Sequence, residues 1–455
     1  MKNVALLNIV GLSEKHIGNH TPFISSWSQN QSRALIEPML PGVTCSVQTT
    51  YLTGKSPGEH GIVANGWLFR DECEVKLWRQ SNKLVQAPSI WDLAKNRNPA
   101  FTAANMFWWY NMYSSVDYSV TPRPQYRANG IKVPDCYSHP ADLRDKLQKE
   151  LGTFPLFNFW GPNANIKSSR WIAEASKKVF AWHRPNLTLV YLPHLDYCLQ
   201  KYGPEDARIA RHLEEIDALV KDLVQYFEKE GVLVHLISEY GIVPVNRAIH
   251  INRLLRKEGL VAVRHENGLE LLDAGQSPAF ALADHQVAHI YVKDKSKIPV
   301  VRRLLENEPG IAQVLDEQGK KLHHIDHTRS GELVAVAEPD SWFTYYYWMD
   351  DHKAPDFARM VDIHSKPGYD PVEMFLDPKK KLIIPRIALK LLGKKLGFRT
   401  LLDVIPLDAT LIKGSHGQLR VEDAYKPIFI GPAKTERMIS PLSVQDIILK
   451  QIFRS

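Results

Sequence analysis

The feature that most constrains the fold is an alternation between short apolar runs and longer segments with helical spacing. The runs LTLVYLPHLDY and VLVHLISEYGI flank residues 207–231, whose apolar positions recur every three to four residues and which end at a glycine. Two similar apolar runs lie earlier in the chain, at 3–12 and 100–107. This strand–helix–strand alternation predicts an α/β fold with a mostly parallel central sheet flanked by helices.

Polar residues stand where three of these predicted strands end. They are Asn8, Asp196 and Glu239. In open parallel sheets the ligand site lies beyond the carboxyl ends of the strands. We therefore expect these three side chains to lie at the site.

Residues 255–345 carry a different pattern. They contain the short apolar runs HIYV, AQVLD and ELVAVAEPD and a helical stretch through VVRRLLENE, which together indicate a small α+β unit. We interpret this unit as an insertion that caps the site. The predicted organisation is a core of residues 1–254 and 346–455, with a cap of residues 255–345.

Charge and cysteine content restrict the partners and the compartment. The formal net charge of +7 favours anionic partners such as phosphate esters, nucleic acid or an anionic membrane surface. The sequence has no recognisable nucleic-acid module and no apolar run of membrane-spanning length, so a small phosphorylated molecule is the favoured partner. The four cysteines are far apart with no CxxC pair, and the start lacks a signal-peptide pattern, so we expect a cytoplasmic protein without disulfides.

One basic stretch, PKKKLIIPRIALKLLGKKLGFR (378–399), is partly amphipathic. We favour the interpretation that it is a solvated surface helix. Weak contact with an anionic membrane surface is the alternative, because basic amphipathic helices bind such surfaces.

The stretch PGVTCSVQTTYLTGKSPGEHGIVANGW (41–67) places the hydroxyl of Thr44 at the start of a predicted helix. A helix N-terminus has free N–H groups and a partial positive charge, so it binds anions and stabilises an alkoxide. Thr44 is therefore either an ordinary N-cap or a nucleophile that attacks phosphorus. Taken alone, its position favours the N-cap.

The whole stretch, however, resembles the nucleotide pyrophosphatase/phosphodiesterase branch of the alkaline phosphatase superfamily. A threonine opens a helix, the helix closes on LTG, and P-x-x-HGI follows. Three further segments match in the family's order: DYCLQKYGP (196–204), LISEYGI (236–242) and LIKGSHG (411–417). The resemblance implies an alkaline-phosphatase-like core, a cap between the last two motifs, a phosphothreonine intermediate on Thr44 and two flanking zinc ions.

The expected metal ligands are altered. Val10 stands where the first strand should offer an aspartate, Gln200 replaces a histidine, and Glu239 and Tyr240 replace an Asp-His pair. Valine cannot bind a metal, and glutamine and tyrosine are poor zinc ligands. The segments WWYNM, TPRP and DIHSKPGYDP also resemble a bacterial group labelled type I phosphodiesterase/nucleotide pyrophosphatase, in which these departures are typical.

Asp196 and His416 match the family's metal ligands, and Glu239 is a conservative replacement. We expect a divalent metal, zinc, manganese or magnesium, with a single ion more plausible than two. Asp196, His416 and Gln200 would hold it. Glu239 would bind a second ion or act as a general base.

Residues outside these motifs could supply further metal ligands. Asp362 and His364 are two residues apart on a predicted extended run, so their side chains would face one way and could share a metal. His285 and His289 in the predicted cap are further candidates, although packing inside the cap is the favoured role for both.

Candidate substrate-binding residues come from arginines and aromatics. Arg70 and Arg123 are possible phosphate clamps, because guanidinium groups pair with phosphate in bidentate fashion. Trp109, from an aromatic-rich segment, and Tyr240 are candidates for contact with a planar or apolar part of the substrate.

The favoured function is a metal-dependent hydrolase of phosphodiester, pyrophosphate or phosphate-ester bonds, with Thr44 as nucleophile. Two alternatives remain open. One is a non-catalytic, anion-binding descendant of the superfamily, and the other is a phosphoryl transferase or mutase.

Overall fold

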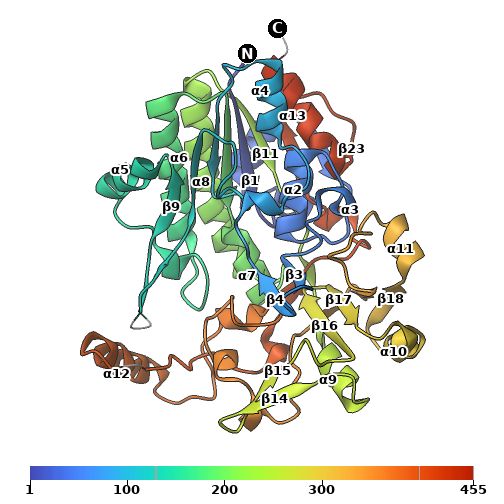
Figure 1. Cartoon of the computed structure of the whole chain (residues 1–455). Coiled ribbons are helices and arrows are strands. Elements are labelled where there is room, and N and C mark those ends of the chain that lie inside the picture. Colours follow the sequence, from blue (N-terminus) through green and yellow to red (C-terminus); the bar gives the residue numbers. More distant parts are fainter. Residues whose placement is uncertain (129–130, 399, 454–455) are drawn as a thin grey trace.

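The computed structural model describes residues 1–128, 131–398 and 400–453, and a large mixed sheet forms its centre (Figure 1). The strand order is β23-β2-β22-β11-β1-β10-β5-β6-β9. Strand β1 lies between β10 and β11 and runs parallel to both, and β5 and β6 continue the parallel part. Antiparallel pairs flank this part, at β22 and β9. The prediction of an α/β fold with a mostly parallel sheet is confirmed.

The strands of this sheet are β1 (Val4–Ile9), β2 (Ser32–Ile36), β5 (Ala103–Met106), β6 (Tyr118–Pro122), β9 (Cys136–His139), β10 (Leu187–Leu192), β11 (Leu233–Ile237), β22 (Ile428–Gly431) and β23 (Met438–Ile439). The helices are α1 (Pro22–Ser28), α2 (Thr44–Thr53), α3 (Pro57–His60), α4 (Ile90–Arg97), α5 (Ala141–Leu151), α6 (Ile166–His183), α7 (His194–Tyr202), α8 (Ile209–Lys229), α9 (Ile251–Lys257), α10 (Ile298–Glu306), α11 (Glu317–Leu322), α12 (Ile383–Lys395) and α13 (Val444–Phe453).

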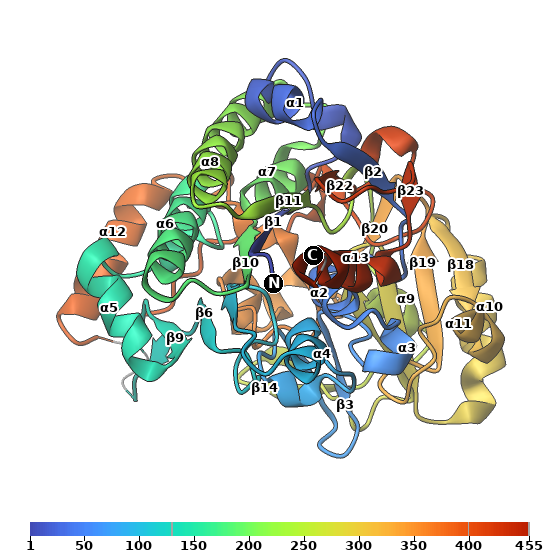
Figure 2. The same ribbon diagram turned by 90° about the horizontal axis from the view of Figure 1, so that it is seen from above.

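Helices cover both faces of the central sheet (Figure 2). Helices α6 and α8 pack on each other and on β10 and β11, and α13 packs on β1 from the other side together with α2 and α4. Strand β1 is buried along its whole length, and so is β10. Continuous apolar strands are expected when a parallel sheet is covered on both faces.

A second, four-stranded antiparallel sheet, the cap sheet, lies below the central sheet in Figure 1. Its order is β16-β17-β19-β18, from β16 (Ala279–Asp284), β17 (Val287–Val292), β18 (Ile311–Leu315) and β19 (Leu333–Ala337). The predicted insertion 255–345 contains this sheet. The hydrophobic cluster behind the sheet is wider, because it also takes in buried side chains from 245–251 and from 342–412.

Short two-stranded pairs complete the described structure. They are formed by β3 (Gly66–Phe69) with β4 (Glu74–Leu77), β7 (Gln125–Tyr126) with β8 (Lys132–Val133), β12 (Val243–Pro244) with β21 (Gly414–Ser415), β13 (Arg247–Ile249) with β20 (Ser341–Phe343), and β14 (Val263–Glu266) with β15 (Leu269–Leu272). The four cysteines are free, as predicted. Among the described residues, no helix combines the length and the hydropathy needed to cross a bilayer.

Gly241 fixes the segment after β11, which carries Glu239 and Tyr240. A Cβ atom at this position would lie 1.5 Å from the carbonyl oxygen of Tyr425, which is backbone and cannot rotate away. Gly18 offers a contrast, because no heavy atom lies within 4 Å of a Cβ built there.

We expect Gly241→Ala to lower the free energy of unfolding by about 2 kcal/mol or more, because two backbone segments must move apart. Urea denaturation measures the loss. Gly18→Ala is the matched control and should stay within about 0.5 kcal/mol of the parent protein. Equal stability of the two variants would contradict the close approach.

Candidate functional site

Thr44 is the first residue of α2, and its side chain does not cap the helix. The N-cap is Val43, and the Thr44 hydroxyl lies 2.9 Å from the hydroxyl oxygen of Tyr240, which follows β11. The N-cap alternative considered for Thr44 is therefore wrong. Its hydroxyl is buried at the positive end of a helix and faces the carboxyl edge of the central sheet.

A chain of hydrogen bonds leads from Thr44 to the start of α7. Tyr240 donates to Oδ1 of Asp196 at 3.2 Å, and Gln200, one turn later on α7, donates to the same oxygen at 3.0 Å. Tyr369 donates to the amide oxygen of Gln200 at 2.8 Å. Asp196 and Gln200, both predicted as metal ligands, are thus side by side.

His416 completes this side of the site. Its Nδ1 lies 2.8 Å from the carbonyl oxygen of Gly42, and its ring stacks on Tyr240 with centroids 3.5 Å apart. Burial holds the pKa of His416 well below its usual value, so the ring is neutral and the carbonyl assigns its hydrogen to Nδ1. The unprotonated Nε2 is buried without a hydrogen-bond partner and lies 3.8 Å from Oδ1 of Asp196.

Glu239 lies on the other side of Thr44. Its Oε1 accepts hydrogen bonds from Asn8, at the end of β1, and from Gln48 on α2, both at 2.6 Å. Its Oε2 is buried without a hydrogen-bond partner. Asn8 and Glu239 were predicted at the strand ends. Gln48 was not, although it is four residues after Thr44 and therefore lies on the same helix face.

The two buried carboxylates have strongly raised pKa values. Burial raises the pKa of Asp196 to about 7, against which the hydrogen bonds from Gln200 and Tyr240 act. Burial raises the pKa of Glu239 to about 8, and the nearby Asp196 adds to the rise. Desolvation penalises the charged form, and the Gln200, Tyr240, Asn8 and Gln48 donors compensate only partly.

The cap sheet contributes the turn between β16 and β17. Asp284 accepts from the backbone N–H of Asn65 at 2.8 Å, and Asn65 in turn accepts from the N–H of Cys45 on α2 at 3.0 Å. His285, at the tip, lies against His416 and Tyr369, with ring centroids 3.8 and 3.7 Å apart. His285 thus reaches the site, whereas His289 contacts the carbonyl oxygen of Val63, in the loop after α3.

Asp362 and His364 are not part of this arrangement, and their predicted extended run is wrong. The carboxylate of Asp362 accepts from the backbone N–H groups of His364 and Ser365, which turns the chain. The His364 ring packs edge-on against Tyr126. The hydrogen bonds from Asp362 to nearby backbone N–H groups stabilise a turn here, in place of the extended strand-like conformation that the sequence pattern suggested.

Neither predicted phosphate clamp joins Thr44. Arg70 is held by Glu332 and by the carbonyls of Thr328 and Ser330 in the cap, and Arg123 is exposed between β6 and β7. Trp109 lies nearer, because its backbone N–H donates to Gln48 at 2.7 Å. Tyr369 was missed by sequence reasoning, because nothing in its local sequence links it to α7.

The residues around Asp196 and His416 fit a metal ion. Two acceptor atoms face each other at 3.8 Å, which is unfavourable unless a proton or a cation lies between them. Zinc bonds to His and Asp measure about 2.0–2.2 Å, so one ion can reach both atoms. The Nδ1–H bond to a backbone carbonyl is also the usual support of a metal-binding histidine.

Another group of possible ligands lies on the opposite side of α7. His194, His212 and Glu215 place ligand atoms within 4.8 Å of one another. These groups are satisfied internally, since the two histidines hydrogen-bond at 3.1 Å and Glu215 pairs with Arg211 at 3.4 Å. His194 lies two residues before Asp196 on α7 and so on a different face of the helix, and His212 and Glu215 are on α8, so this group does not belong to the Asp196 site.

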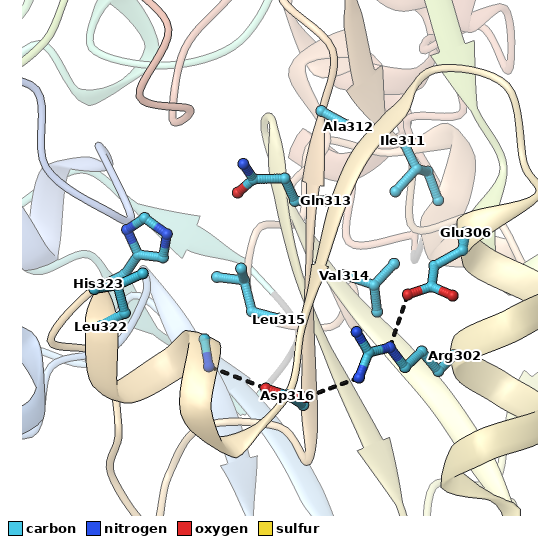
Figure 3. Close-up of a pocket in the computed structure, with 11 residues that line it drawn as sticks. Arg302, Glu306, Ile311, Ala312, Gln313, Val314, Leu315, Asp316, Leu322 and His323 are labelled. Atoms are coloured by element: carbon cyan, nitrogen blue, oxygen red, sulfur yellow. Dashed lines mark hydrogen bonds and ion pairs between the residues drawn. The ribbon is translucent and has the colours of Figure 1, made fainter.

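Two hollows of the described structure lie on the cap and near α12, away from Thr44. One hollow of about 410 Å³ is on the cap between α10, β18 and α11 (Figure 3). Arg302 in its wall pairs with Glu306 and Asp316, both at 2.7 Å, so its charge is compensated. Thr44 itself is buried, so access for a substrate requires the covering side chains to move.

Comparison with known families gives one match over most of the chain. The family model described as Type I phosphodiesterase / nucleotide pyrophosphatase matches residues 4–370. An uncharacterized pyrophosphatase/phosphodiesterase of Schizosaccharomyces pombe is 24% identical over 277 residues, which are 58% of this chain and 46% of that protein. Ectonucleotide pyrophosphatase/phosphodiesterase 2 of Saccharomyces cerevisiae is 25% identical over 383 residues, 79% of this chain and 67% of that protein. The chain thus spans less than half of the first relative's length.

Solved structures share the fold at low sequence identity. An inactive variant of murine ectonucleotide pyrophosphatase / phosphodiesterase 5 in complex with AMP has a TM-score of 0.59 and 15% identity, covering 99% of this chain and 95% of that one. Phosphonoacetate hydrolase from Sinorhizobium meliloti 1021 in complex with phosphonoformate has a TM-score of 0.62 and 14% identity, covering 99% and 96%. The alkaline-phosphatase-like fold expected from the motifs is confirmed.

Because the pKa of Glu239 is raised, the stability difference between the parent protein and the Glu239→Gln variant should depend on pH. In metal-free protein, we expect Glu239→Gln to become more stable relative to the parent as pH rises from about 5 to 8. The unfolded glutamate ionises near its ordinary pKa of 4.5, whereas the folded one stays protonated up to about 8, so the parent loses stability across this window.

Thermal unfolding in chelator, measured for both proteins at several pH values, tests this expectation. Glu228→Gln on α8 is the control, because its carboxylate accepts from Trp27 at the surface. A stability difference that does not change with pH would contradict the buried, protonated state of Glu239.

Proposed function

The chain belongs to the type I phosphodiesterase / nucleotide pyrophosphatase family, and from this premise we propose that it hydrolyses a phosphodiester or pyrophosphate bond of a small phosphorylated molecule. Thr44 is the proposed nucleophile, and one divalent ion (zinc, manganese or magnesium) is the proposed cofactor. The observation that carries the proposal is the Thr44 hydroxyl at the N-terminus of α2, linked through Tyr240 to the Asp196–His416 pair.

Hydrogen bonding orients the proposed nucleophile. When Asp196 is ionised, Tyr240 donates its only proton to it, so in the Thr44–Tyr240 bond the proton comes from Thr44. The lone pairs of the Thr44 oxygen are then directed away from Tyr240 and are available for attack. The phosphoryl oxygens would meet the N–H groups of the first turn of α2.

The covalent steps assign a role to each side of the site. Thr44 Oγ forms a bond to phosphorus while the bond to the leaving oxygen breaks and that oxygen departs as an anion. The Thr44 proton passes to Tyr240 as Tyr240 passes its own proton to ionised Asp196. Water then displaces Thr44 from phosphorus, and Thr44 recovers its proton along the same path. Ionised Glu239 accepts the proton of that water. A divalent ion held by Asp196 and His416 would supply positive charge beside Thr44 and the phosphoryl oxygens.

The relatives support a small phosphorylated substrate. The murine relative holds AMP in an inactive variant, and the Sinorhizobium relative holds phosphonoformate. Next to Gln48, which accepts from the Trp109 backbone, the rings of Trp109 and Trp78 lie with centroids 5.1 Å apart and are half-buried. This aromatic pair is the proposed contact for a planar group of the substrate.

Removing the nucleophile gives the first test. We expect Thr44→Ala to lower the rate of bis(4-nitrophenyl) phosphate hydrolysis by at least about a thousandfold, and Thr44→Ser to keep part of it. Thr53→Ala is the matched control, because Thr53 is a buried threonine of the same helix whose hydroxyl bonds the carbonyl of Thr49.

Mass spectrometry after acid quenching should detect phosphate on Thr44, with more of it in Glu239→Gln. Full activity of Thr44→Ala would overturn its role as nucleophile. Phosphate that stays on Thr44 and passes only to an added alcohol would indicate a transferase or mutase instead.

Metal content gives the second test. We expect about one divalent ion per chain after incubation with zinc, manganese or magnesium, and its loss in His416→Ala, because His416 supplies a neutral ligand nitrogen. His212→Ala is the control, since it removes a histidine of the other ligand group on α7 and α8.

Elemental analysis of untagged protein measures the content. Protein that takes up none of the three metals and hydrolyses no phosphodiester would indicate a non-catalytic anion-binding function. An ion that disappears in His212→Ala and not in His416→Ala would place the metal on the wrong side of α7 for this mechanism.

A further inference from the structure

Helix α12 presents an apolar face to solvent, and this face does not depend on the proposed catalytic function. Figure 1 shows the helix projecting from the lower edge of the molecule. Three side-chain stripes follow from its 3.6-residue period. One stripe, Ile383 and Ile387, packs against the hydrophobic cluster behind the cap sheet.

The second stripe is charged, and its side chains pair with Asp403. Arg386 lies 2.8 Å from the carboxylate of Asp403, and Lys390, one turn later, pairs with the same carboxylate. Lys380, before the helix, also pairs with Asp403. Three cations thus share one anion, which leaves a net positive charge at the root of the helix.

The third and outermost stripe is apolar. Leu389 is 69% exposed and Leu392 is 54% exposed, and Ile384 and Leu391 beside them are also exposed. Leu382 and Leu396 extend the apolar surface at the two ends of the helix. The predicted surface helix is confirmed within the described part of 378–399, but its exposed side is apolar, whereas a solvated helix usually places its charges outward.

We propose that α12 binds the surface of an anionic lipid bilayer, with Ile384, Leu389, Leu391 and Leu392 inserted among the acyl chains. Lys379 and Lys381, both exposed beside the helix, would meet the lipid headgroups. A basic helix with a broad apolar face that lies in the plane of the interface is the usual form of such a contact.

Composition favours lipid over a protein partner. Protein interfaces are enriched in aromatic side chains, methionine and arginine at their centres and depleted in lysine. The outward face of α12 is aliphatic, with no aromatic or methionine side chain in Ile383–Lys395, and the exposed charges beside it are Arg386, Lys379 and Lys381. The positive charge at the root of the helix is also complementary to anionic lipid.

Vesicle co-sedimentation of the whole chain tests the proposal. We expect binding to vesicles of 30% phosphatidylglycerol in phosphatidylcholine, weaker binding to phosphatidylcholine alone, and weaker binding in about 0.5 M than in about 0.1 M salt. The double variant Leu389→Ser/Leu392→Ser should bind at least about tenfold more weakly, because both side chains lose apolar area that the bilayer would bury.

Leu322→Ser is the matched control, since Leu322 on the cap is 75% exposed and should not contribute. Both variants replace exposed side chains, so their thermal unfolding should match that of the parent. Equal vesicle binding by the double variant and the control would overturn the proposal, and so would binding to neither vesicle. Self-association of the parent that the double variant abolishes would show that the face binds a second copy instead.

Discussion

The site depends on two carboxylates, Asp196 and Glu239, that the fold buries at the carboxyl edge of its central sheet. Burial raises both pKa values to near or above neutrality, and neutral amides and a tyrosine donate to them. Neutral donors offset only part of the cost of ionising a buried group. The charged state of this site therefore needs positive charge from outside the side chains that now surround it. The N-terminus of α2 provides a little of that charge, and a bound cation would provide more.

The same energetics explain why His416 and Glu239 each keep an unpartnered atom. A buried atom without a partner costs about 1–3 kcal/mol, so a ligand that contacts such an atom recovers part of this cost. At His416 the atom is an unprotonated nitrogen, the form in which imidazole binds metals. At Glu239 it is a carboxylate oxygen with a raised pKa, the form suited to proton transfer near neutral pH.

Much of this arrangement could be predicted from sequence, because several of its residues lie in short segments with a clear strand or helix pattern. Thr44, Asp196 and Glu239 belong to short segments whose strand or helix pattern fixes where they lie relative to the sheet edge. His285 could not be placed in the same way, because its position depends on a cap turn meeting a loop that begins about 130 residues later. The prediction for Asp362 was wrong for a different reason. Its carboxylate accepts from the backbone N–H of His364, and the turn that results interrupts the alternating pattern of an extended segment. The orientation of α12 was missed because amphipathicity identifies an apolar face without showing which way it points.

The replacements in the ligand set have a consistent direction. Val10, Gln200 and Tyr240 all put neutral side chains where the family's pattern has aspartate or histidine, so the site has fewer ligands for a second cation. Tyr240 donates to Asp196 and accepts from Thr44 through one oxygen, whereas a neutral histidine would need its two separate ring nitrogens for these two bonds. This link holds the hydroxyl of Thr44 beside the remaining Asp196–His416 pair. The proposed site, with one cation and a tyrosine that orients the proposed nucleophile, is therefore a coherent arrangement, in which hydrogen bonding would perform part of what a second metal otherwise does.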